Sequence, residues 1–173
     1  EFYKKAEQIF IELKKERGIY HVGKNLAKIE RLKGNYQDAL TILLKILESY
    51  DHEISRPVIY LKMHMVECYS ALNRYDEVKT LCGEIVNNLT TMNSIDSLHN
   101  GHVQRFLGEV ALRTGKYSDA EKYLSAGKKI FHSYKSESWL YYLLLLQAEL
   151  AIHRSDYGAC LRLVNSIIAF YRK

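Results

Sequence analysis

The sequence predicts an all-α fold, an α-solenoid of about nine helices in which antiparallel helix pairs stack along the 173 residues. A phrase that starts with tyrosine occurs five times, at intervals of 33 to 42 residues. Pro57 is the only proline and most glycines stand singly, which favours helices joined by short turns over a β-sandwich. A repeat of this length indicates that each unit buries its apolar face against the next.

The recurring phrase has the pattern of a helix. In each copy a small residue follows the tyrosine by three positions, and an apolar residue comes four positions later. Offsets of 3 and 4 place these side chains on one helical face. The copies begin at Tyr3, Tyr36, Tyr75, Tyr117 and Tyr157.

A second shared phrase precedes four of the tyrosines by nine to ten residues: Leu26-Ala27, Met65-Val66, Leu107-Gly108 and Gln147-Ala148. Helix-breaking residues such as Gly34, Asn73 and Gly115 stand between the two phrases. Each repeat therefore reads as helix A, a tight turn and helix B. The small residues allow the two helices to approach to about 8–10 Å. We expect Gly108 to be compensated by such a contact, because a mid-helix glycine costs about 0.5–1 kcal/mol relative to alanine.

Helix boundaries follow from these phrases and from the residues between them. Ser55 before Pro57 resembles a helix start, and Ser94 and Ser136 are expected N-caps of the sixth and eighth helices. The nine expected helices span about residues 2–16, 19–33, 36–50, 55–72, 75–92, 96–114, 117–134, 137–154 and 157–172.

Two stretches resemble the tetratricopeptide repeat (TPR): LGEVALRTGKYSDAEKYLSAG at residues 107–127 and LAKIERLKGNYQDALTILLKI at residues 26–46. The resemblance covers nearly the whole chain, but the intervals are mostly longer than the usual 34 residues and the closing proline is missing. A longer variant of about 40 residues fits best, and the resemblance implies a right-handed solenoid. The single domain 1–173 would contain repeats at about 18–52, 53–93, 94–134 and 135–173.

The first 17 residues read as a helix B without its helix A, so we expect the chain to be a fragment of a longer protein. The last helix, from Tyr157, is apolar for a solenoid cap. Self-association through this helix is one expectation for what covers it.

Composition narrows the class of protein. The three cysteines lack a C-x-x-C pair, which favours a reducing compartment such as the cytoplasm. No apolar run approaches the about 20 residues that a membrane span needs, so we expect a soluble protein with no membrane partner. The net charge is only +5 and the basic residues are interleaved with acidic ones, so we do not expect nucleic acid as a partner.

Catalytic motifs are not found in the sequence, and we predict no enzyme activity, cofactor or metal. His99 and His102 have the spacing of two metal ligands, with Asp96 as the only third ligand nearby, but solvent-exposed or groove histidines are the simpler interpretation. His64 and Cys68 lie four apart like a base and a nucleophile, without an orienting third group. All three cysteines read more simply as core residues.

The TPR resemblance implies that the A helices line a concave groove for a peptide or helix of a partner protein, with a basic end suited to an acidic segment. We therefore predict a non-catalytic interaction module. The alternative is a sensory or regulatory domain of a larger signalling or transcription protein, binding a peptide or small ligand. The predicted groove residues are His21, Lys24, Asn25, Lys28, Arg31, Tyr60, Met63, His64, Glu67, His102, Arg105, Phe106, Glu109, Tyr142, Leu145 and Glu149.

Overall fold

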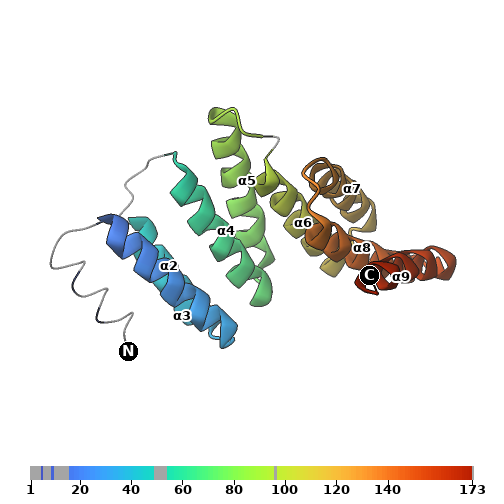
Figure 1. Ribbon diagram of the computed structural model, residues 1–173, viewed down its shortest axis with the longest axis horizontal. Helices are drawn as coiled ribbons and strands as arrows, with labels where there is room; N and C mark the ends of the chain where they lie inside the picture. The colour runs from blue at the N-terminus through green and yellow to red at the C-terminus, as the bar shows by residue number, and fades with distance from the viewer. Residues whose placement is uncertain (1–4, 6–8, 10–15, 49–53, 96, 173) are drawn as a thin grey trace. The chain divides into compact units, whose positions relative to one another are not determined.

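The computed structural model describes residues 5, 9, 16–48, 54–95 and 97–172, and these form helices without any strand (Figure 1). The prediction of an all-α fold is confirmed, and each predicted helix from 19–33 onward is present with both ends within three residues of expectation. The helix expected at 2–16 falls, apart from residues 5 and 9, outside the described part. The eight described helices are α2 (Glu16–Leu32), α3 (Tyr36–Glu48), α4 (Arg56–Ala71), α5 (Tyr75–Thr91), α6 (Leu98–Arg113), α7 (Tyr117–Ser133), α8 (Glu137–His153) and α9 (Tyr157–Tyr171).

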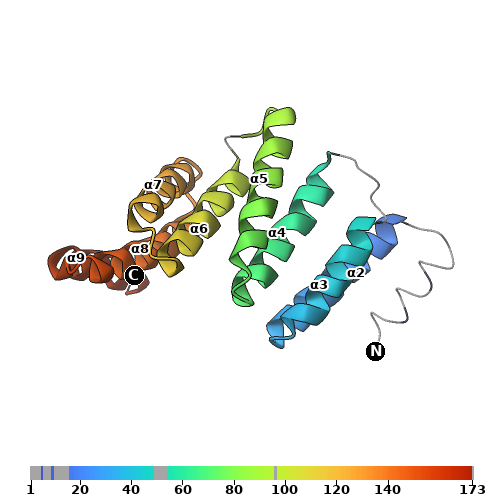
Figure 2. The same ribbon diagram turned by 180° about the vertical axis from the view of Figure 1, so that it is seen from behind.

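The chain divides into two compact units, Glu1–Leu81 and Cys82–Lys173, with the division inside α5. In the first unit α2 packs on α3 and α3 packs on α4. In the second unit α6, α7, α8 and α9 pack each on the next, and α6 also touches α8. Neighbouring pairs such as α2 with α3 and α8 with α9 lie side by side from both viewpoints (Figure 1, Figure 2). None of the described helices combines the length and apolarity that crossing a membrane requires.

Residues in the left-handed backbone conformation end the A helices, at the helix-breaking residues that the sequence predicts. Gly34, Asn73 and Gly115 have φ values of +83°, +57° and +73°, and Ser155 takes the same conformation at +59°. In the first of these turns the Asn35 N–H donates to the Glu30 carbonyl at 2.9 Å. This bond gives a partner to one of the last-turn carbonyls, which have none within the helix. Each A helix can therefore reverse into its B helix within a few residues.

The predicted N-caps are only partly correct. Ser55 and Ser136 occupy the N-cap positions of α4 and α8, although neither side chain makes a capping hydrogen bond. The prediction for Ser94 is wrong, because α6 starts later and its N-cap is Ser97. Ser94 instead closes the end of α5, where its N–H donates to the Leu89 carbonyl at 2.8 Å.

Small residues at the helix crossings allow the close packing that the sequence predicts. A Cβ atom at Gly108 would lie 2.7 Å from Cδ2 of Leu124, a fully buried side chain of α7. Ala120 of α7 is likewise completely buried. Helices α6 and α7 thus touch where one of them has no side chain at all.

The last helix exposes an apolar outer face. Leu161 is 63% exposed and Tyr171 is 71% exposed, while Ile167 is buried. The register position of Leu161 is occupied in α7 by Glu121, forty residues earlier. Helix α9 is therefore more apolar than α7 on this side, and self-association through it stays a prediction.

The glycine at the α6–α7 crossing gives a test of this packing. Gly108→Ala should lower the free energy of unfolding by about 1–2 kcal/mol, the overpacking cost less the gain from replacing a helical glycine. Chemical denaturation followed by circular dichroism measures the change. The matched control is Gly83→Ala in α5, where an added Cβ would meet nothing within 4 Å and should stabilise the protein slightly. Equal effects of the two substitutions would contradict the predicted crossing.

Candidate partner-binding faces

The A helices of the first unit, α2 and α4, carry nine of the predicted groove positions. Side-chain contacts between Arg31 and Glu67 and between Lys24 and Tyr60 show that the structure brings the two helices together. We call this set the basic face; it consists of His21, Lys24, Asn25, Lys28, Arg31, Tyr60, Met63, His64 and Glu67.

Lys24 is held between two aromatic rings. Its Nζ lies 5.5 Å from the ring centroid of Tyr20 and 5.3 Å from that of Tyr60. The Tyr60 ring in turn meets His64 edge-on at 4.6 Å. Each cation–π contact at an exposed site contributes about 0.5–1 kcal/mol. Lys24 therefore links α2 to α4 as well as contributing charge to the face.

Arg31 is paired within the face. Its guanidinium forms an ion pair with Glu67 and a contact with Nδ1 of His64, and that Nδ1 lies 3.1 Å from Glu67 Oε2. Lys28 and His21 are exposed on the same helix as Arg31. Met63, in contrast, is buried and supports the face from below. The accessible positive charge is thus centred on Lys28.

The A helices of the second unit, α6 and α8, carry the other seven predicted positions, and a buried arginine forms their centre. Arg105 is only 5% exposed, and its guanidinium carbon lies 3.6 Å from the ring centroid of Phe106, 5.1 Å from that of Tyr142 and 5.5 Å from that of Trp139. Glu109 pairs with it at 3.4 Å. We call these seven residues together with Trp139 of α8 the aromatic face; it consists of His102, Arg105, Phe106, Glu109, Trp139, Tyr142, Leu145 and Glu149.

Large apolar side chains are exposed above this arginine. Trp139 and Tyr142 are each 37% exposed, and Leu145 is 52% exposed. The His102 ring packs edge-on against Trp139 at 4.4 Å, so the indole is held in place. Burial, and to a smaller extent the Glu109 carboxylate, raises the pKa of Tyr142. Its hydroxyl is therefore a hydrogen-bond donor at neutral pH.

An Arg–Glu ion pair joins neighbouring A helices in each unit. Arg113 of α6 pairs with Glu149 of α8, as Arg31 of α2 pairs with Glu67 of α4. Glu67 and Glu149 each directly follow the second shared phrase, so they occupy the same register position two repeats apart. Both were predicted as partner-binding residues, and in the structure both also hold the repeats together.

The buried cysteines are protonated thiols. Burial raises the pKa of Cys68 to about 11 and that of Cys82 to about 12. Cys68 therefore carries almost no thiolate at neutral pH. His64, the residue that the sequence spacing offers as its base, instead contacts Arg31 and Glu67. Among the described residues no three acidic, histidine or cysteine side chains converge on a common point, and Asp96 lies outside that set.

Sequence reasoning missed one residue of the aromatic face and one residue that supports the basic face. Trp139 lies three residues before Tyr142 on α8, and its spacing on the helix together with its being the only tryptophan could have indicated it. Tyr20, the second ring beside Lys24, gave no comparable signal. Phe106 was predicted as a contact residue, and the structure places it beneath the surface.

Comparisons with known proteins bear on the fold. No protein-family model matches the sequence, and no curated protein matches it. The structure is similar to the crystal structure of BtubC (BKLC) from P. vanneervenii, with a TM-score of 0.78, 14% identity, and coverage of 98% of this chain and 73% of that one. It is also similar to a crystal structure of putative kinesin light chain TPR-like repeats from Podosopora anserina, with a TM-score of 0.69, 13% identity, and coverage of 87% and 74%. A variant of those repeats, in which methionine replaces a glutamine, gives the same TM-score.

The chain has a TPR-like repeat fold. At these identities the similarity defines the architecture alone, and it confirms the resemblance seen in the two repeat stretches. The TPR-like chain is thus built from stacked helical repeats.

Thiol reactivity tests the burial of the cysteines. In the native protein at pH 8, we expect a disulfide reagent such as 4,4′-dithiodipyridine to modify Cys160 first, because it is the only one of the three cysteines that is not fully buried. Cys68 and Cys82 should react only on unfolding, because both are buried and burial raises the pKa of Cys68 to about 11. Mass spectrometry after brief labelling identifies the sites. Rapid modification of all three thiols would contradict the packing.

Proposed function

We propose that the chain is a non-catalytic protein-interaction module whose A-helix faces each bind a segment of a partner protein. The observation that carries the proposal is the aromatic face, where Trp139 and Tyr142 are exposed with the buried Arg105 against their rings, and Leu145 is exposed on the same helix. The TPR-like fold supports it, since such scaffolds commonly bind proteins.

The composition of the aromatic face suits an apolar side chain of the partner. Tryptophan, tyrosine and arginine are the residue types that dominate binding energy at protein interfaces. Trp139 and Tyr142 are already held by His102 and Arg105, so these two side chains would lose little conformational entropy when a partner binds. The nearby charges of Arg105 and Glu109 are paired. An uncharged, apolar anchor would therefore bind here with the smallest desolvation cost.

The basic face suits an acidic segment. Lys28 and His21 are exposed, and Lys24 is held at the surface by Tyr20 and Tyr60. Arg31 is already paired with Glu67, so the attraction for an acidic segment would come from Lys24 and Lys28. Charged side chains of opposite sign would speed association and lose strength as salt screens them.

Peptides selected from a random library against the chain can test the aromatic face. Trp139 is the only tryptophan, so its fluorescence reports binding at this face directly when the peptides themselves lack tryptophan. We expect Leu145→Glu to weaken the selected peptides by at least about tenfold, since it places a charge at the centre of an apolar contact. The control is Leu161→Glu on α9, a similarly exposed leucine that should leave affinity unchanged. Equal affinity of the selected peptides for Leu145→Glu and Leu161→Glu would contradict the proposal. So would binding that leaves the Trp139 fluorescence unchanged.

A charge reversal tests the basic face separately. Lys28→Glu should weaken acidic peptides and reduce the salt dependence of their binding, while the melting temperature barely moves, because surface substitutions usually change stability by less than about 0.5 kcal/mol. Lys45→Glu on α3 makes the same charge change away from the face and is the matched control. Equal losses in the two variants would show a general charge effect and would count against the site.

A further inference from the structure

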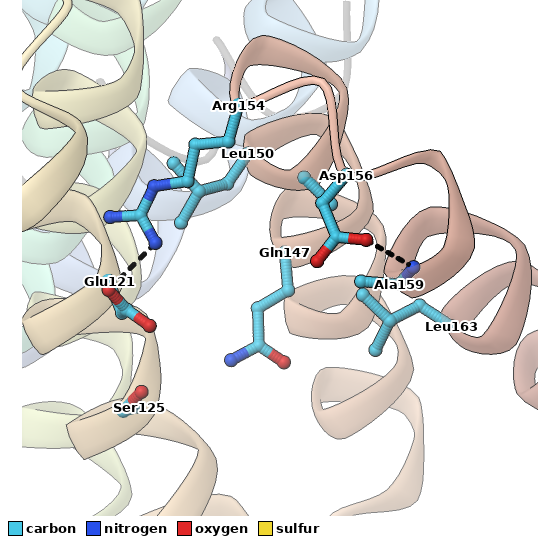
Figure 3. Close-up of a pocket in the computed structure, with 9 residues that line it drawn as sticks. Glu121, Ser125, Gln147, Leu150, Arg154, Asp156, Ala159 and Leu163 are labelled. Carbon is cyan, nitrogen blue, oxygen red and sulfur yellow. Dashed lines mark hydrogen bonds and ion pairs between the residues drawn. The ribbon is translucent and has the colours of Figure 1, made fainter.

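A cleft of about 260 Å³ lies on the B-helix side of the second unit, away from the predicted groove positions (Figure 3). Helices α7 and α9 form its walls and α8 forms its floor. Leu150, Ala151, Ala159 and Leu163 make much of the lining apolar. The cleft is below the about 300–1,000 Å³ typical of small-molecule pockets. Its size therefore suits one long side chain from another protein.

One end of the cleft is closed by a fixed arginine. Arg154 donates from Nη1 to Glu121 at 2.8 Å and from Nη2 to the Tyr117 carbonyl at 3.1 Å. Both terminal nitrogens are thus engaged on α7, and the guanidinium does not fill the cleft. Figure 3 shows this pair at the α7 wall, with open space between it and α9.

The lining of the cleft also offers hydrogen-bond acceptors. Asp156 caps α9, with one carboxylate oxygen accepting from the Ala159 N–H at 2.9 Å. Its other oxygen points toward the open space above the Gln147 side chain (Figure 3). Ser125 adds a hydroxyl from the α7 wall. Within the part of the chain that the structure describes, the Gln147 amide and the Ser125 hydroxyl have no hydrogen-bond partner.

We propose that this cleft binds a lysine side chain presented by a partner protein. The aliphatic stem would lie against Leu150 and Leu163, and the ammonium group would donate to the open Asp156 carboxylate oxygen and to the Gln147 side-chain oxygen. The charged lining groups are two carboxylates, Glu121 and Asp156, and one guanidinium, so they leave one negative charge that a lysine neutralises. The site is separate from both A-helix faces and does not depend on their function.

The probe is the tripeptide acetyl-Gly-Lys-Gly-amide, titrated into the isotope-labelled protein and followed by NMR. The comparison peptides replace lysine with acetyl-lysine, which keeps the length, and with norleucine, which keeps only the stem. We expect saturable shifts of the Gln147 side-chain NH₂ and the Ala159 N–H, with the lysine peptide binding at least threefold more tightly than either neutral peptide. Equal binding of the three peptides, shifts confined to other residues, or no shift up to the solubility limit of the lysine peptide would overturn the proposal.

Asp156→Asn is the decisive variant, because asparagine keeps the N-cap of α9 while the charge is removed. We expect it to weaken the lysine peptide about threefold to fivefold, the effect of one partly exposed ion pair. Adding Glu121→Gln leaves Arg154 as the only charged lining group and should abolish binding. Asp119→Asn makes the same charge change on α7 outside the cleft and should have no effect. Equal losses of lysine-peptide binding in Asp119→Asn and Asp156→Asn would overturn the site. Loss of the library-selected peptides in Leu145→Glu, or of acidic peptides in Lys28→Glu, bears only on the A-helix faces.

Discussion

The close approach of helix A to helix B is the constraint on which the rest of this structure depends. At Gly108 the backbone of α6 lies against the side chain of Leu124, where even a methyl group would collide. The left-handed turn at Gly115 reverses the chain directly before α7, so the two helices meet along their length. A hairpin packed in this way still has an apolar side, and in the second unit α8 covers it.

Stacking brings successive A helices next to each other within each unit, and this arrangement creates the candidate binding faces. Arg31 with Glu67, and Arg113 with Glu149, cross from one A helix to the next. Residues that would contact a partner are therefore also residues that hold repeats together. Because their side chains are fixed before binding, a partner would meet an ordered surface, which reduces the entropy lost on association.

The opposite side of the second unit is shaped by the same spacing. Helices α7 and α9 both pack on α8, and between them the side chains of α8 remain reachable in a cleft. Arg154 and Asp156 stand at its edges because the turn between α8 and α9 passes there. A scaffold of this kind thus offers chemically different surfaces on its A-helix and B-helix sides.

The sequence by itself determined the secondary structure, the turns and the small residues at the crossings, because these depend on local propensity and on a spacing that repeats. It also indicated which helical positions lie on the A-helix side. Only the tertiary structure decided what each of those positions does: Arg105 and Phe106 lie beneath the surface, Lys24 rests between two tyrosines, and Trp139 joins the aromatic face. Register gives the direction of a side chain from its own helix, whereas burial and pairing depend on residues 33 to 36 positions away on the neighbouring repeat.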